Sequence, residues 1–249
     1  MFQLNQLEKF LFFDIETAGG EASFNELSER MSHLWSTRAD LLRNHLSAKY
    51  PDNAGKTDEE LYLNKAGLQA EFGRIVCISF GIIKVVDGFP KINVVSYAGE
   101  DERMIIEKSF KLITHIGKDS QSKLVGHNIK RFDIPYLCKR AYILGIPVPY
   151  MLQTYDKKPW EMPFVDTCEV WSFGAWQEGF ASLDLISGVL GIDSPKDDIK
   201  GDQVHTVFYE DGDITRIQTY CQKDVVALIR ILMQLSGLNR IEDSDIIYK

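Results

Sequence analysis

An apolar run at residues 10–13 continues through Asp14, Ile15 and Glu16. Its aromatic and β-branched content predicts a buried central strand. Because alternate side chains of a strand share a face, Asp14 and Glu16 are expected to project side by side from the end of this strand. Two buried like charges are costly unless a divalent cation neutralises them, which makes the pair a candidate metal site. An acid that closes a strand can also cap the following helix, and the pair alone does not decide between the two interpretations.

The following residues have a helical pattern. After Gly19 and Gly20 interrupt the strand, apolar residues recur at roughly helical spacing in a polar background: Phe24, Leu27, Met31, Leu34, Trp35, Leu41, Leu42 and Leu46. A capping box at residues 57–60 begins another short helix. The pattern therefore predicts a helical insert over about residues 20–70, directly after the first strand.

Strands and helices alternate along the rest of the chain. Two strands, at 74–86 and 91–97, are expected to form a hairpin around the turn at 87–90. Further strands are expected at 123–126 and 164–166, and helices at 101–116, 133–144, 183–190 and 214–235. In this order an antiparallel meander feeds a parallel half, which predicts an α/β fold with a mixed sheet flanked by helices. Functional sites in such sheets lie at the carboxyl ends of the strands.

Composition narrows the class of protein. A chain of 249 residues with 45% hydrophobic and 26% charged residues is expected to form a single globular domain. The start of the chain lacks a signal peptide and no apolar run reaches membrane-spanning length, so we expect a cytoplasmic protein without a membrane partner. The four cysteines show no Cys-x-x-Cys spacing and are expected to be reduced core residues. A net charge of −8 argues against a strongly cationic nucleic-acid binder, but permits an enzyme that holds a few phosphates through metal ions.

Two further segments supply acids at the expected functional edge. Asn128 follows a short strand, and Asp133 begins the next helix. Tyr220 and Asp224 are four residues apart in a helical stretch, so a phenol and a carboxylate share one helix face. His127 is expected to be a neighbour of the site, because oxygen-rich magnesium sites seldom include imidazole.

These segments together resemble a known family. In chain order, Asp14-x-Glu16, Asn128-x-x-x-Phe132-Asp133 and Tyr220-x-x-x-Asp224 resemble the three motifs of 3′–5′ exonucleases that have four acidic residues and a tyrosine. The similarity is greatest to the exonuclease domain of family B DNA polymerases, in a stand-alone form. It extends to the segments around residues 164–167, 182–192, 195–196 and 201–204, and covers nearly the whole chain except the insert.

The resemblance implies a ribonuclease-H-like fold, two Mg²⁺ or Mn²⁺ ions and release of nucleoside 5′-monophosphates from a 3′ end. Asp14 would bridge both ions, Glu16 and Asp224 would complete the ion on the side of the nucleophile, and Asp133 would hold the second ion directly or through water. Tyr220 would hydrogen-bond the attacking water. No polymerase palm or thumb fits after residue 240, so we expect either that any proofreading acts in trans or that the task is a different one.

Substrate contacts are a further implication. Ile15 and Thr17 would lie beside the terminal nucleotide, and Phe132 belongs to the same predicted substrate set. Asn128 either contacts the substrate or fixes the turn from strand to helix. Asp166 is most simply the N-cap after its strand, and the residues 157–160, Lys-Lys-Pro-Trp, combine charge with an aromatic platform for single strands.

Three functions remain open at this level. The first is a metal-dependent 3′–5′ exonuclease that favours single-stranded DNA. The second is an exoribonuclease on short RNA, which needs few phosphate contacts. The third is a non-catalytic nucleic-acid-binding or protein-binding module, which the intact set of acids disfavours. The insert begins directly after Glu16 and Thr17, so we expect it to cap the site and select 3′ ends, although a partner that covers its apolar stripe is the alternative.

Overall fold

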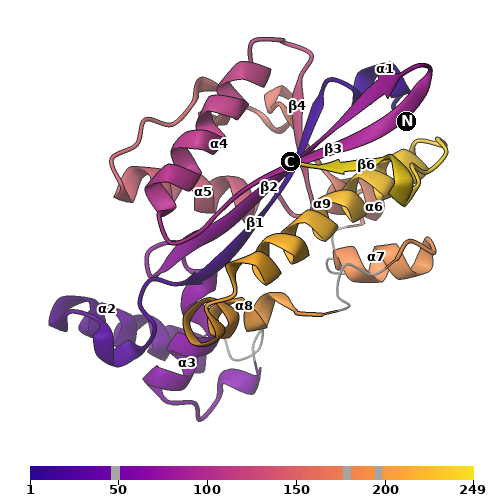
Figure 1. The fold of residues 1–249 in the computed structure, drawn as a ribbon. Helices are drawn as coiled ribbons and strands as arrows, with labels where there is room; N and C mark the ends of the chain where they lie inside the picture. Colours follow the sequence, from indigo (N-terminus) through magenta and orange to yellow (C-terminus); the bar gives the residue numbers. More distant parts are fainter. Residues whose placement is uncertain (46–50, 176–180, 194–197) are drawn as a thin grey trace.

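A computed structural model describes residues 1–45, 51–175, 181–193 and 198–249 (Figure 1). Leu46 of the helical pattern and the segment 195–196 of the resemblance therefore lie outside the described residues. The described residues form a six-stranded mixed sheet in the order β5-β4-β1-β2-β3-β6. Its strands are β1 (Phe10–Gly19), β2 (Gly73–Val86), β3 (Phe89–Ala98), β4 (Lys123–Gly126), β5 (Phe164–Asp166) and β6 (Ile246–Tyr248).

Strand directions confirm the predicted mixed sheet. β1, β2 and β3 form an antiparallel meander, and β4 lies parallel to β1 and β5 parallel to β4. β4 and β5 have the predicted bounds, and the hairpin turns at Asp87 and Gly88, both of which have positive φ. The short strand β6, which pairs parallel with β3, was not predicted because three residues carry too little pattern.

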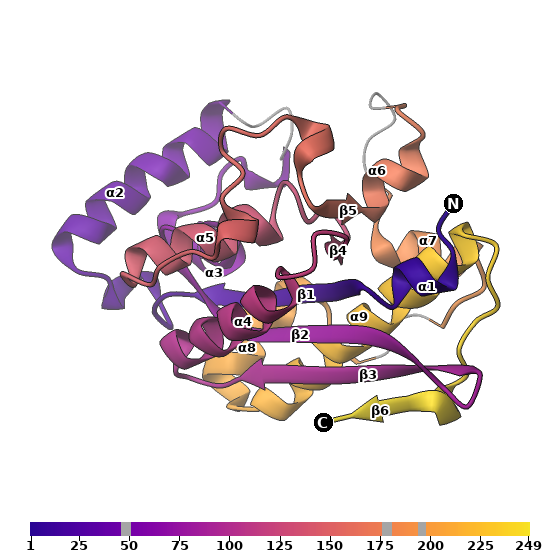
Figure 2. The ribbon, with the colours of Figure 1, turned by 90° about the horizontal axis from the view of Figure 1, so that it is seen from above.

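Helices cover both faces of the sheet. The described helices are α1 (Leu4–Leu7), α2 (Glu29–Asp40), α3 (Asp58–Lys65), α4 (Glu102–Ile116), α5 (Asp133–Ile143), α6 (Thr167–Ser172), α7 (Leu183–Val189), α8 (Val204–Thr206) and α9 (Ile214–Leu235). Figures 1 and 2 show α4 and α5 on one side of the central strands and α9 on the other. In the described part of the chain, no helix combines the length and apolar character needed to cross a bilayer.

Side chains of β1 alternate between the two layers of the core. Leu11, Phe13 and Ile15 pack in the cluster beneath α4 and α5, whereas Phe10 and Phe12 pack against α9. α9 approaches the sheet closely at Gly81, where an added Cβ would lie 2.7 Å from side-chain atoms of α9. This close contact fixes the height of α9 above β1.

β1 does not end at the acids, which corrects the sequence prediction. It continues to Gly19, paired with β2 throughout, with a register shift between Glu16 and Thr17. The parallel partner β4 pairs with β1 only as far as Phe12. Asp14 and Glu16 therefore follow the last residue of β1 that pairs with β4, which is the carboxyl edge of the parallel half of the sheet.

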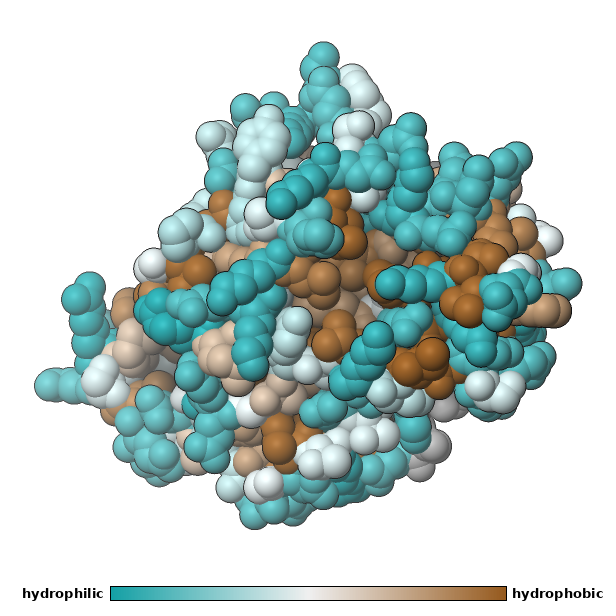
Figure 3. Space-filling view, turned by 45° about the horizontal axis from the view of Figure 1, so that its top comes forward, coloured by the Kyte–Doolittle hydropathy of each residue, from teal (hydrophilic) through white to brown (hydrophobic). Residues whose placement is uncertain are grey.

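The insert forms a small core of its own beyond the end of β1. Trp35 of α2 is fully buried, and its ring centre lies 5.2 Å from that of Tyr62 and 5.0 Å from that of Phe72. Leu34, which was predicted to share the apolar stripe, is 44% exposed instead. The chain itself therefore covers Trp35, and part of the stripe remains exposed. On the face of the molecule seen in Figure 3, apolar patches are interspersed with hydrophilic residues.

Candidate active site

The pleat of β1 directs the first two acids toward α9. Asp14 and Glu16 have the same parity as Phe12, which packs against α9. Glu16 is buried and Asp14 is half-buried. Neighbouring β2 fixes their positions, because Asp14 pairs with Ser79 and Glu16 with Cys77. The two carboxylates therefore lie on one face of a strand that is held by hydrogen bonds to β2.

α9 supplies a tyrosine and an acid from the facing side. Asp213 caps this helix of 22 residues by accepting from the backbone N–H of Arg216. Tyr220 and Asp224 lie one turn apart and are 6% and 8% exposed. Tyr220 interacts electrostatically with Asp224, Glu16 and Asp14, so the phenol and these carboxylates share one small volume.

Asp133 reaches the same volume from the start of α5. It is 3% exposed, and the backbone of Ile15 hydrogen-bonds to its carboxylate. That contact occurs beyond Phe12, where β4 no longer pairs with β1. The structure thus brings together all four acids and the tyrosine that the sequence predicted.

The loop before α5 is held by Asp166. Its carboxylate accepts the backbone N–H of Asn128 at 2.9 Å, of Lys130 at 3.3 Å and of Cys168 at 3.0 Å. Asp166 is therefore the predicted N-cap of α6 and also fixes the neighbouring loop. Asn128 adopts φ 62°, a left-handed conformation that Asn tolerates better than most residues, so it forms the turn from β4 to α5.

Burial and mutual repulsion raise the pKa of three acids in this site, Asp14, Glu16 and Asp133. Burial raises the pKa of Asp14 well above its usual value, and the charge of Asp224 raises it further. Burial, followed by the charge of Asp14, does the same to the pKa of Glu16. Burial raises the pKa of Asp133 to about 7, although backbone hydrogen bonds oppose the shift. Such a cluster would be stabilised by a cation at its centre.

A cysteine lies next to the acids, which the sequence did not indicate. The Cys221 thiol lies 3.7 Å from Oδ2 of Asp14, and one ligand atom each from Asp14, Glu16 and Cys221 lie within 4.8 Å of one another. The prediction of a buried, reduced cysteine is confirmed. Its position could have been noticed, because Cys221 lies three residues before Asp224 on the same helix face.

The predicted substrate residues surround the acids with different exposure. Ile15 is 5% exposed in the core beneath α5, whereas Thr17, Asn128 and Phe132 are half-buried. The ring of Phe132 lies 5.4 Å from that of Tyr136 in a tilted contact. Their contacts with a substrate remain a prediction.

Comparison with known proteins agrees with this geometry. A family model described as a predicted 3′-5′ exonuclease related to the exonuclease domain of PolB matches residues 66–238. The chain belongs to this family. Asp133, Tyr220 and Asp224 lie within the matched segment, whereas Asp14 and Glu16 precede it. Their place in the site therefore depends on the geometry of β1.

A solved structure shares the fold. The family B DNA polymerase from the hyperthermophilic archaeon Pyrobaculum calidifontis matches with a TM-score of 0.50 and 18% sequence identity. The match covers 90% of this chain and 24% of the polymerase chain, so this chain spans about a quarter of the length of that protein. Among curated proteins, none matches. The structural match supports the ribonuclease-H-like exonuclease fold.

Proposed function

We propose that this protein removes nucleotides from the 3′ end of single-stranded DNA with two Mg²⁺ or Mn²⁺ ions and releases nucleoside 5′-monophosphates. The observation that carries the proposal is the convergence of four carboxylates from three elements, β1, α5 and α9, beside one tyrosine. Short 3′ ends need few phosphate contacts, which accords with the net charge of −8.

The donor set fits divalent cations of this type. Asp14, Glu16, Asp133 and Asp224 offer hard carboxylate oxygens, which Mg²⁺ and Mn²⁺ prefer. All four repel one another electrostatically, so two bound cations would relieve a repulsion that the fold otherwise has to bear. When bound, the ions would stabilise charge on the attacking and leaving oxygens of the phosphodiester.

Each side chain then has a separate task. Asp14 would be shared by both cations, Glu16 and Asp224 would complete one site, and Asp133 would hold the other. Burial and the charge of Asp224 raise the pKa of Tyr220, so its hydroxyl keeps its proton at neutral pH. Tyr220 would therefore orient the attacking water as a hydrogen-bonding partner and would not act as a resting base.

The same edge of the sheet offers places for the terminal nucleotide. Thr17 lies one residue beyond Glu16 on β1, and Asn128 and Phe132 lie in the loop that leads to Asp133. We assign Ile15 to positioning through its backbone, because its side chain lies in the core and its backbone bonds to Asp133.

The direct test uses matched 5′-labelled DNA and RNA oligonucleotides with Mg²⁺ or Mn²⁺. We expect a ladder that shortens from the 3′ end of the DNA strand, and no ladder with Asp14→Asn. Asp87→Asn is the matched control, because Asp87 is exposed, lies in the hairpin turn and has a positive φ that Asn accepts. A ladder on RNA alone would establish the exoribonuclease. Absence of metal-dependent cleavage on both polymers would refute the nuclease proposal and favour a binding module.

A further inference from the structure

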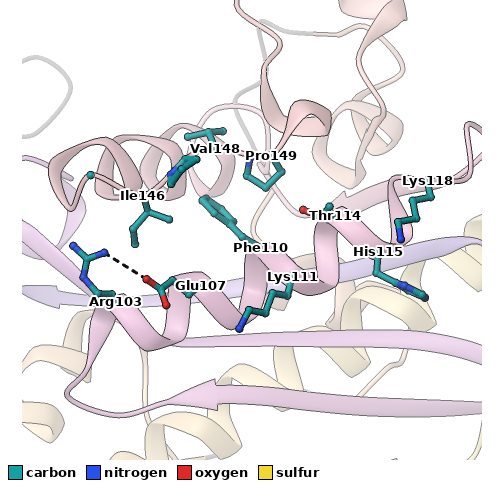
Figure 4. A pocket seen from close by; sticks show the side chains of 12 residues that line it. Arg103, Glu107, Phe110, Lys111, Thr114, His115, Lys118, Ile146, Val148 and Pro149 are labelled. Carbon is teal, nitrogen blue, oxygen red and sulfur yellow. Dashed lines mark hydrogen bonds and ion pairs between the residues drawn. The ribbon is translucent and has the colours of Figure 1, made fainter.

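A groove lies along α4, on the face of the sheet opposite α9. Its cavity has a volume of about 830 Å³ and is lined by α4 on one side and residues 145–149 on the other. Figure 4 shows Phe110 between α4 and the residues Val148 and Pro149. Arg103 is paired with Glu107 near one end of the groove, and Lys118 lies near the other (Figure 4).

The groove continues beyond Lys118. A second cavity, of about 460 Å³, shares Thr114, Lys118 and Pro149 with the first and is also lined by Tyr150 and Lys157. The two cavities therefore form one continuous surface, which we call the α4 groove.

The charge of the α4 groove is positive although the protein is acidic. Within the described part of the chain, Lys111 and Lys118 of the groove have no ion-pair partner. Three acids line the same surface: Glu107 lies 3.4 Å from Arg103, Asp119 lies 3.9 Å from Lys9, and Glu161 accepts a backbone N–H at 2.9 Å. Arg103, Lys111, Lys118 and Lys157 outnumber them, so the net charge of the lining is weakly positive. Uncompensated lysines on a protein of net charge −8 favour an anionic ligand at this place.

Exposed aromatic rings lie in residues 150–160, two of them beside Lys157 and Lys158. Tyr150, Tyr155 and Trp160 are 78%, 88% and 77% exposed. The ammonium of Lys157 lies 4.8 Å from the ring centre of Tyr150, and that of Lys158 lies 5.4 Å from Trp160. Exposed rings provide stacking surfaces for bases, and the adjacent ammonium groups can neutralise phosphates.

We propose that the α4 groove and the rings of residues 150–160 bind the single-stranded part of the substrate away from its 3′ end. This inference rests on the proposed exonuclease function, since the acid cluster would hold only the terminal nucleotides. The rings would stack on bases of any sequence, and Lys111, Lys118 and Lys157 would contact phosphates. An acidic peptide would use the lysines but would leave three exposed rings without a ligand, so the surface fits nucleic acid better.

Binding without cleavage tests the groove. Fluorescence anisotropy with labelled oligodeoxythymidine of about 20 and about 4 nucleotides, in EDTA, measures affinity at several salt concentrations. The double variant Tyr150→Ala/Lys157→Ala should weaken binding of the long strand about 5- to 150-fold. It should also lower the salt slope by about 0.7, because one phosphate contact is lost. The short strand should bind weakly to wild type and variant alike, because EDTA removes the cations that would hold the terminal nucleotides.

A charge-only variant and a matched control complete the test. Lys111→Ala/Lys118→Ala should lower the salt slope by about 1.4 without removing a ring. Lys84→Ala/Phe89→Ala removes an exposed lysine and a ring that is 69% exposed from the β2–β3 hairpin, and should bind like wild type. Unfolding temperatures of all variants show that the fold is retained.

Two results would contradict the proposal that the α4 groove binds the strand. One is unchanged affinity and slope in both groove variants, and the other is an equal loss in the hairpin control. If wild type cleaves DNA while the groove variants bind as wild type does, only the groove assignment is wrong. If wild type binds the long strand through the groove but never cleaves it with Mg²⁺ or Mn²⁺, the proposed function is wrong and the groove assignment remains.

Discussion

The two faces of the sheet differ in the charge and the burial of their polar side chains. On the α9 face, carboxylates with raised pKa values are enclosed between β1, α5 and α9. On the α4 face, lysines and aromatic rings are exposed above an aliphatic core. The difference indicates a division of work: the buried acids would set the rate of hydrolysis, and the exposed cations would set the affinity for long strands. Substitutions on the two faces should therefore change different kinetic parameters.

Geometry explains why only one face can perform the chemistry. Backbone pairing with β2 fixes Asp14 and Glu16, and Asp133 is tied to β1 through the backbone of Ile15. Positions held in this way meet the requirement of two-metal catalysis for a fixed donor set. A lysine in an open groove keeps its rotamer freedom, which suffices for binding a phosphate.

The largest effect on the rate of cleavage is expected on the α9 face, which we call the acid face because the four carboxylates lie there. Asp14→Asn or Asp224→Asn should lower the rate of cleavage by more than about 1000-fold, because a cation or its position is lost. Folding should be retained, since removal of one charge relieves repulsion. Single-turnover assays on a short DNA strand measure the rate, with Asp87→Asn as control. Near wild-type cleavage by either folded variant would disprove the assignment of these acids.

Substitution of Tyr220, on the same face, should lower the rate of cleavage less than substitution of an acid. Tyr220→Phe removes only the hydroxyl that positions water, so the chemical step should slow about 10- to 1000-fold while metal and substrate affinity are kept. Tyr248→Phe, with an exposed ring, is the control. Rates at saturating metal report the effect, and an unchanged rate would reduce Tyr220 to a packing residue.

Sequence reasoning recovered the acid face better than the α4 face. Asp14, Asp133 and Asp224 stand in short motifs, so their residue type and spacing identify them before any contact is known. Cys221 was missed as a neighbour of Asp14 because its contact joins residues 207 positions apart. The α4 groove was also hidden, since its lysines come from α4 and from residue 157, and only packing brings them to one surface. The segment 157–160 alone suggested a platform.

The predicted end of β1 was wrong for a related reason. The sequence showed an apolar run followed by acids and glycines, which resembled the end of a strand. In the structure, His205 accepts the backbone N–H of Gly19 at 3.0 Å, and Tyr209 donates to the carbonyls of Gly19 and Gly20. These partners lie far away in the sequence, and they keep the segment after Glu16 extended.

The insert begins soon after Glu16 and Thr17, at the edge of the sheet that carries the acids. We therefore expect it to alter the choice of substrate more than the rate of cleavage. The N–H of Gly20 donates to the carbonyl of Phe72 at 2.7 Å, which places the two ends of the insert side by side. A short Gly-Ser linker can therefore replace residues 22–65. We expect changed cleavage ladders among single-stranded, recessed and blunt 3′ ends, with little change in metal affinity.

A milder pair of variants tests the same idea if the linker variant does not fold. Trp35→Ala should loosen the insert, since loss of a buried Trp costs about 3–5 kcal/mol, whereas Leu34→Ala removes an exposed side chain. Altered ladders with Trp35→Ala alone support a cap. A changed mass in solution with identical ladders would instead favour the partner hypothesis.

The smallest expected effect is on stability. The free energy of unfolding should depend on pH through the buried acids and not through the residues of the α4 groove. Burial raises the pKa of Asp133 to about 7, so the folded, metal-free protein holds more protons than the unfolded chain between about pH 4 and 7. Its free energy of unfolding from this group should fall as pH rises through that window.

Thermal unfolding in EDTA at pH 5 and pH 8 measures this difference. We expect a lower unfolding temperature at pH 8, by at least about 2 °C. Mn²⁺ should restore it at pH 8 more than at pH 5, because protons compete with the cation for Asp14, Glu16, Asp133 and Asp224. Asp133→Asn should flatten the dependence on pH, and Lys111→Ala/Lys118→Ala should leave it as in wild type. Equal slopes in wild type and Asp133→Asn would show that Asp133 does not carry the titration.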